Sequence, residues 1–324
     1  MSSVTIYADG DWDGVFATAV LNYALTSRGA KVFIEFPPPQ SRRGLVINNA
    51  YSVEITPYMG AELRNSVLID HHDPRIRGGY VAKFDENGRR SITLQIIGAK
   101  SALDVALEYA RTLNVYVDLP KEIIKDVAYI DMGKPSRLTR LGRAMYGAYR
   151  WFIHNQEFRT EMLNFAMSII TKRTVKLTPT IIEGAKNFEK ALELRKEYIS
   201  KAPYILANEV PIVVISKAYD NDFIKENYEY LKVVANEIAY DLERKHPLVV
   251  VIREEAGIHT MYVYTLNPQV SLASLLRKVS ARIPSITYSV RRNVSIINFR
   301  NPAEAKLDNA LKVANEIVAE YISK

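Results

Sequence analysis

The chain has 324 residues, of which 48% are hydrophobic and 24% charged, as is ordinary for a globular protein of about two domains. No apolar run approaches the roughly 20 residues that span a bilayer, and the lack of cysteine excludes disulfides and thiolate metal sites. The formal charge of +7 favours a polyanionic partner, and because the N-terminus carries no signal-like segment, we expect a cytoplasmic protein.

The N-terminal part of the sequence predicts an α/β domain with a mostly parallel sheet of about five strands. It begins with a βαβ unit, and an extended stretch, a short strand and a hairpin with an Asn87-Gly88 turn follow. A further helix precedes a last segment, which we interpret as a strand that ends near Asp131. In chain order these segments are 4–8, 14–29, 31–36, 45–57, 66–70, 80–97, 101–113 and 123–133.

The rest of the chain predicts a helical region and then a second, smaller α/β domain. Residues 134–200 have helical periodicity throughout, and 178–202 reads as one connecting helix capped by Thr178 before Pro179. The second domain alternates strands at 210–216, 247–254, 259–266 and 294–299 with helices at 227–245, 271–283 and 303–324. We therefore expect three parts, at 1–175, 176–202 and 203–324.

Acidic and histidine side chains follow several of the predicted strands. The stretch "DGDWDG" follows the first strand, Glu54 ends another, "DHH" closes a third, and Asp131 ends the last. Parallel strands bring their carboxyl ends to one edge of a sheet, where crowded carboxylates repel one another unless a cation compensates them. Oxygen and imidazole donors suit Mn²⁺, or Mg²⁺, and a pair of such ions can hydrolyse phosphate esters. The predicted metal ligands are Asp9, Asp11, Asp13, Glu54, Asp70, His71 and Asp131.

These motifs resemble those of the DHH phosphoesterase superfamily, and the spacing over residues 1–135 is most similar to its RecJ-like, archaeal-type nucleases. The resemblance implies two divalent ions, Mn²⁺ preferred and Mg²⁺ possible, with Asp70, His71 and His72 as the catalytic motif. It also implies that residues 203–324 form a degenerate DHHA1-like substrate-binding domain. Two features depart from the family pattern. Glu54 stands where an aspartate is usual, and a Gly-Gly-His segment is absent, because Gly257 is the one glycine after residue 203.

Clusters of basic residues predict where a nucleic acid binds. Arginines follow the DHH motif, and Lys134, Arg137, Arg140 and Arg143 recur at helical spacing before several aromatic residues that could stack on bases. An amphipathic helix with a basic solvent-facing side explains the same spacing. The predicted contacts are Arg75, Arg77, Lys134, Arg137, Arg140, Arg291, Arg292 and Arg300.

The leading hypothesis from the sequence is a metal-dependent exonuclease that hydrolyses single-stranded DNA or RNA by a two-metal mechanism. One alternative, implied by the resemblance, is a weak or silent RecJ-related replication scaffold that binds GINS and the replicative helicase. The other is a nano-RNase or small-nucleotide phosphatase, whose substrate needs only a short basic pocket. The density of retained acids argues against the scaffold, since a silent site has no physical reason to keep a repulsive cluster.

Overall fold

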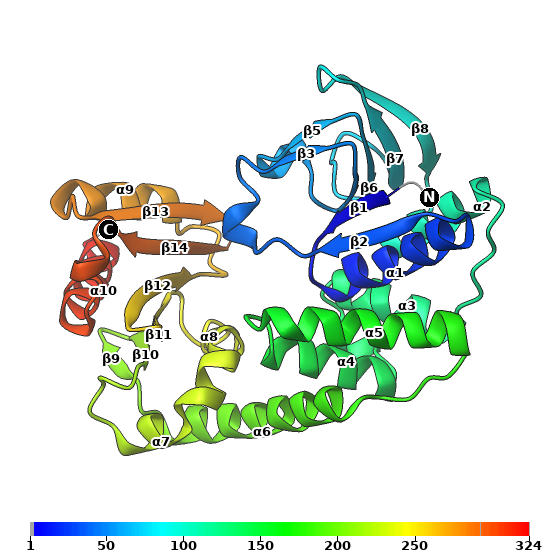
Figure 1. Ribbon diagram of the computed structural model, residues 1–324. Helices are drawn as coiled ribbons and strands as arrows, with labels where there is room; N and C mark the ends of the chain where they lie inside the picture. Colours follow the sequence, from blue (N-terminus) through cyan, green and yellow to red (C-terminus); the bar gives the residue numbers. More distant parts are fainter. Residues whose placement is uncertain (1–2, 292, 324) are drawn as a thin grey trace. The chain divides into compact units, whose positions relative to one another are not determined.

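The computed structural model, which describes residues 3–291 and 293–323, divides into two compact units (Figure 1). The first unit extends to Lys186 and the second begins at Asn187, so that the division falls inside helix α6 (Pro179–Lys201). As expected, Thr178 caps this helix, since its side chain accepts a hydrogen bond from the backbone N–H of Ile181. The three-part division expected from the sequence stays a prediction. Among the described helices, none has both the length and the apolar character needed to cross a bilayer.

The first unit contains a mixed sheet with the strand order β2-β1-β4-β6-β7-β8 among the described residues. Strands β2, β1, β4 and β6 run parallel, and the β7–β8 hairpin adds to β6 in antiparallel fashion, as the turn signal predicted. These strands are β1 (Ser3–Ala8), β2 (Lys31–Glu35), β4 (Tyr51–Val53), β6 (Ser66–Asp70), β7 (Gly79–Phe84) and β8 (Arg90–Ile96). The α/β class is therefore confirmed.

Helices cover one face of this sheet, and a small separate sheet covers part of the other. The helices are α1 (Trp12–Ser27), α2 (Ala102–Thr112), α3 (Lys121–Asp131), α4 (Arg140–Trp151) and α5 (Gln156–Lys172). The small sheet pairs β3 (Val46–Asn48) with β5 (Glu62–Arg64). Because side chains alternate along a strand, Ile69 of β6 joins the core beneath the helices, whereas Leu68 packs with Ile47 and Leu63 of the small sheet.

The segment that was expected to be a strand ending in Asp131 is helix α3. Its buried residues Ile123 and Val127 are four apart, a spacing that places both on one side of a helix. A short apolar run is ambiguous between strand and helix, and here the helical packing of Ile123 and Val127 against α1 prevails. The sequence interpretation of this element was wrong, although Asp131 still reaches the site.

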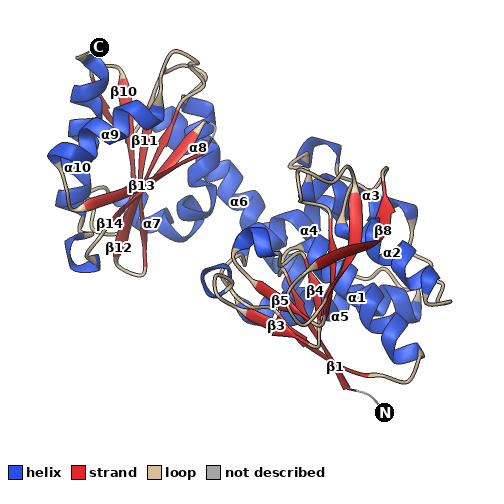
Figure 2. Ribbon diagram, turned by 90° about the horizontal axis from the view of Figure 1, so that it is seen from above, coloured by secondary structure: helices blue, strands red, loops and turns tan. Residues whose placement is uncertain are grey.

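The second unit contains one sheet with the strand order β13-β14-β12-β11-β10-β9 among its described residues. Helices α9 and α10 lie on one face of this sheet and α7 and α8 on the other (Figure 2). The strands are β9 (Ile205–Ala207), β10 (Val210–Ile215), β11 (Val249–Glu255), β12 (Ile258–Tyr264), β13 (Ile286–Arg291) and β14 (Val294–Phe299). The helices are α7 (Asp222–Leu231), α8 (Ala235–Leu242), α9 (Leu272–Arg282) and α10 (Leu307–Ile322).

The second unit differs from the sequence expectation in two respects. The single helix expected over 227–245 is divided into α7 and α8 by a short 3₁₀ turn, Lys232–Val234. Two strands were not predicted. β9 has only three residues, all apolar, and β13 was overlooked although its sequence ITYSVR alternates between apolar and polar residues.

Asp126 of α3 fixes the start of α4 and thereby the loop that follows Asp131. Its buried carboxylate accepts hydrogen bonds from the backbone N–H and the hydroxyl of Thr139, the residue that caps α4. Gly142 lies so close to this carboxylate that any larger side chain would collide with it.

We predict that Asp126→Ala lowers the free energy of unfolding by about 1–3 kcal/mol, because the substitution leaves polar groups of Thr139 without partners. Urea unfolding followed by circular dichroism measures this change. The exposed Asp118→Ala is a matched control, for which a change within roughly 0.5 kcal/mol is expected. Equal effects of the two substitutions would contradict the prediction.

Candidate metal centre

Three neighbouring parallel strands deliver acidic and histidine side chains to one edge of the first sheet. β1 leads into Asp9, β4 into Glu54, and β6 ends at Asp70. The ladder continues one residue beyond the strands, since the N–H of Asp9 donates to Val53 and that of Glu54 to Ile69, each at 3.0 Å. The convergence that the sequence predicted at this edge follows directly from the strand order.

His71 is at the centre of the cluster. Its Nε2 lies 3.2 Å from an oxygen of Glu54, 3.2 Å from one of Asp13 and 3.5 Å from one of Asp131. Ligand atoms of Glu54, His71, His72 and Asp131 all lie within 4.8 Å of one another. Four segments that are far apart in the sequence thus contribute donors to one small volume.

Several polar atoms at this centre are buried without hydrogen-bond partners. Both carboxylate oxygens of Glu54 and Nε2 of His71 are in this state, and Glu54 is only 1% exposed. A buried carboxylate without donors is costly, and a divalent cation is the partner that oxygen and imidazole donors in this arrangement suit. The residues present therefore fit a metal ion. Glu54 also has a φ of 62°, a left-handed conformation that is costly for a side chain of this kind and is common at functional sites.

Asp11 and Asp13 are oriented by two helix N-termini. Asp11 caps α1 and accepts a hydrogen bond from the N–H of Gly14. The buried Asp13 accepts hydrogen bonds from the N–H groups of Ala102 (2.6 Å) and Leu103 (2.9 Å), which begin α2. Donors at a helix N-terminus favour a carboxylate, so α2 holds Asp13 with its oxygen toward His71.

Position 14 needs a glycine because no side chain fits there. Gly14 lies within the first turn of α1, and a Cβ atom would collide with the carbonyl of Asp9 and lie 3.0 Å from Glu54 Oε2.

Asp9 has a different partner from the other acids. Its carboxylate forms a bidentate ion pair with Arg42, at 2.7 and 2.8 Å. The sequence did not single out Arg42, which lies after a run of prolines with no local signal of its partner. Metal binding by Asp9 stays a prediction.

Asp70 holds His72 through a hydrogen-bonded chain that also includes Tyr80. The Asp70 carboxylate contacts His72 Nδ1 at 3.2 Å and accepts a hydrogen bond from the Tyr80 hydroxyl at 2.7 Å. Burial alone would raise the pKa of Asp70, but these hydrogen bonds lower it below its ordinary value. The same bond to Asp70 raises the pKa of His72 to about 9. Asp70 thus contacts His72 in this structure, and metal binding by Asp70 stays a prediction. Tyr80 is a contributor that the sequence did not indicate.

The remaining acids repel one another. Burial, together with the neighbouring Asp9 and Asp13 carboxylates, raises the pKa of Asp11 to about 8. Burial, followed by Asp13, raises the pKa of Glu54 well above its ordinary value, and the same two causes raise that of Asp131. Without a cation, the folded protein therefore retains protons on groups that are normally ionised at neutral pH.

Comparison with known proteins gives the fold. No family model matches the sequence, and no curated protein matches it. The solved structure of the pGpG-specific phosphodiesterase PggH from Vibrio cholerae shares 13% identity with a TM-score of 0.54, over 99% of this chain and 100% of that chain. The structure of an exonuclease RecJ bound to manganese shares 13% identity with a TM-score of 0.51, over 98% of this chain and 89% of that chain.

The chain has the DHH-phosphoesterase fold. Within it, "DHH" of this sequence is the Asp70–His72 segment at the end of β6. The resemblance noted in the sequence is thus confirmed at the level of the fold.

In this DHH-phosphoesterase fold, the predicted basic residues are not placed as one helical row. Helix α4 begins at Arg140, whereas Lys134 lies before the 3₁₀ turn Pro135–Arg137 and Arg137 ends that turn. The expectation of a shared helical face was therefore wrong. Proline at 135 and the cap at Thr139 end one element and begin the next. All three basic residues are exposed, as is Arg77.

The other predicted basic residues have varied environments. Arg75 is paired with Asp73 through two hydrogen bonds of 2.9 Å. In the second unit Arg291 and Arg300 are exposed, and Arg292 lies outside the described residues. Contact of any of these residues with nucleic acid stays a prediction.

The metal-free protein is predicted to become less stable as the pH rises. Asp11 titrates near pH 4 when unfolded and at about 8 when folded, so the folded state binds more protons across this window and stability falls with increasing pH. Glu54 shifts in the same direction, and the stabilisation from protonated His72 is lost as the pH rises through about 9. The lowered pKa of Asp70 acts only in more acidic solution.

Thermal unfolding in EDTA at about pH 5 and about pH 8 measures this effect. We expect a Tm at least about 4 °C lower at the higher pH, since roughly 2–4 °C accompanies each kcal/mol in a unit of this size. Asp11→Asn removes one of the titrating groups and should reduce the difference. An unchanged or higher Tm at the higher pH would show that the acids do not repel one another in the folded state.

Proposed function

We propose that this protein is a metal-dependent phosphodiesterase that hydrolyses single-stranded DNA or RNA from an end. The observation that carries the proposal is that the buried carboxylate oxygens of Glu54 and Nε2 of His71, which could bind a metal, make no hydrogen bond at the strand edge. The fold supports it, because two proteins that share this fold are described as a phosphodiesterase and an exonuclease.

The residues that would hold the metal are Asp11, Asp13, Glu54, His71 and Asp131, with Asp9 as a further candidate. This number of donors exceeds the need of one ion that also keeps positions for water and substrate, which supports two. The mixture of carboxylates and imidazole favours Mn²⁺ over Mg²⁺. Divalent cations in such a site supply charge stabilisation on phosphoryl oxygens and activation of the attacking water.

His72 has the position of a group that faces the substrate. Its side chain is 42% exposed, against 11% for His71, and Asp70 fixes it through Nδ1. The other ring nitrogen, Nε2, lies 4.0 Å from Asp131. We assign His72 to contact with the scissile phosphate or with the cation, and Asp70 to holding the imidazole in place. In this proposal Asp70 is a positioning residue for His72 and not a metal ligand.

The proposal predicts that His71→Ala abolishes both Mn²⁺ binding and hydrolysis. Because changes even to residues that only position metal ligands cost about 10- to 100-fold, removal of a central ligand should cost at least about 100-fold in kcat/KM. Metal content is measured by titration calorimetry of protein stripped with EDTA, and hydrolysis with end-labelled single-stranded oligonucleotides. The exposed His154→Ala is the matched control and should retain both.

The length of the substrate separates the proposal from the small-substrate alternative. A processive or stepwise ladder from a long strand supports the exonuclease, whereas cleavage of dinucleotides alone favours a nano-RNase or small-nucleotide phosphatase. A protein that binds no Mn²⁺ and degrades neither substrate would instead favour the scaffold that binds a helicase or GINS-type protein.

A further inference from the structure

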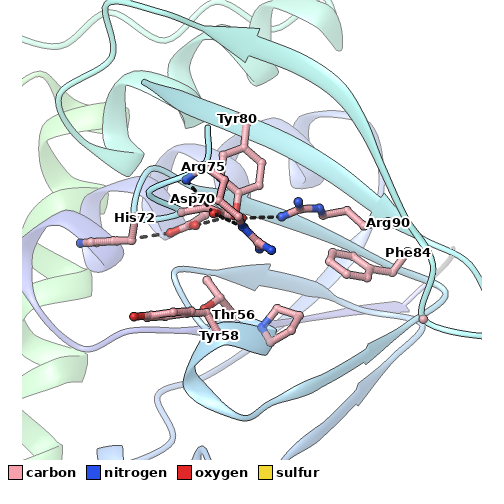
Figure 3. Close-up of a pocket in the computed structure, with 11 residues that line it drawn as sticks. Thr56, Tyr58, Asp70, His72, Arg75, Tyr80, Phe84 and Arg90 are labelled. Carbon is pink, nitrogen blue, oxygen red and sulfur yellow. Dashed lines mark hydrogen bonds and ion pairs between the residues drawn. The ribbon is translucent and has the colours of Figure 1, made fainter. Parts of the chain in front are cut away.

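A cavity of about 290 Å³ opens beside His72, on the side of the sheet that the helices do not cover (Figure 3). It lies between the 3₁₀ turn Pro57–Met59, the end of β6 and the β7–β8 hairpin. His72 adjoins the metal cluster as well, since its ring also approaches Glu54 and Asp131, neither of which lines the cavity. The cavity is therefore adjacent to the proposed phosphate position and not part of the metal centre.

The two walls of the cavity differ in chemistry. Tyr58 forms one wall and is 79% exposed, while Arg75 and Arg90 lie across the space from it and Phe84 closes the far end (Figure 3). The exposure of Tyr58 is not by itself evidence of a site, because Tyr116 is equally exposed and lines none of the described cavities. Its position at the mouth of this cavity is what matters.

Asp73 fixes the two arginines with their guanidinium groups beside the cavity. It binds Arg75 in bidentate fashion at 2.9 Å and Arg90 at 2.7 Å, and is itself 7% exposed. The Arg75 and Arg90 hydrogen bonds hold the pKa of Asp73 well below its usual range. One carboxylate between two guanidinium groups leaves a net positive charge, and it also immobilises planar groups on which an aromatic ring can stack.

This combination suits a nucleobase better than a phosphate. A base is planar, has polar edges, and stacks on tyrosine rings and on guanidinium planes. The volume is near the lower limit of roughly 300–1,000 Å³ for ligand pockets, enough for one base with its sugar. Phe84 and the ring of Tyr80 would leave a phosphate poorly solvated on one side. We infer that this pocket binds the nucleobase of the residue next to the scissile phosphodiester.

The inference rests on the proposed function. It deepens that function because it names the part of the nucleotide substrate that this pocket recognises, which is the base next to the cleaved bond. A base held between Tyr58 and the arginines would place its phosphate toward His72. Stacking tolerates any base, so the pocket selects for the presence of a base and not for its sequence.

Binding of adenosine 5′-monophosphate and of ribose 5-phosphate, measured by calorimetry with and without Mn²⁺, tests the pocket apart from catalysis. The full-length protein should bind the nucleotide at least about 10-fold more tightly than the sugar phosphate. Tyr58→Ala should weaken nucleotide binding by roughly 5- to 100-fold and leave sugar-phosphate binding unchanged. Tyr58→Phe keeps the ring and should behave like the parent protein, as should the matched control Tyr116→Ala.

Equal binding of the two ligands by the parent, or unchanged nucleotide binding in Tyr58→Ala, would overturn the nucleobase pocket. A substitution Arg75→Gln that weakens both ligands equally, with no base-dependent difference, would mark an anion site instead and would also overturn it. Failure of the protein to hydrolyse oligonucleotides while the base-dependent difference persists would overturn only the proposed exonuclease.

Discussion

Crowding of carboxylates around one imidazole is the constraint on which the rest of the first unit depends. Adjacent parallel strands bring the acids together, and His71 lies among oxygens of Glu54, Asp13 and Asp131. Surrounding groups offset or direct this negative charge: the N-terminus of α2 binds Asp13, and Arg42 neutralises Asp9. Those groups leave the negative charge at the centre itself uncompensated, so the acids there either retain protons or bind a cation.

The sequence predicted the strand-end convergence because it follows from a general property of parallel sheets. It could not predict partners that lie far along the chain and leave no local signal, as with Arg42 beside Asp9 and Tyr80 beside Asp70. Asp131 was placed at the right site on the wrong element, because a short apolar run does not distinguish strand from helix. The need for Gly14 arises from a close approach that only the folded backbone creates.

The small sheet of β3 and β5, which packs on the face of the first sheet opposite the helices, explains why the metal cluster and the adjoining pocket have different surroundings. Helices pack against one face, and the β3–β5 pair packs against part of the other. The segment that forms this small sheet also carries Glu54 to the metal cluster and the turn Pro57–Met59 to the adjoining pocket. The connection between β3 and β5 therefore carries both Glu54 and the turn that lines the adjoining pocket.

The side chains proposed to bind the metal come from separate segments of the chain, and this links metal binding to folding. The cluster draws on the chain from Asp11 to Asp131, and apart from sequence neighbours such as Asp11 with Asp13 and His71 with His72, its members come from separate segments. Bringing distant segments together costs loop-closure entropy, so the complete cluster exists only where these segments are held in place by the fold. An unfolded or partly folded chain offers scattered single ligands and competes weakly for metal. Capture of the cation would thus report that β1, β4, β6 and α3 have all reached their final places.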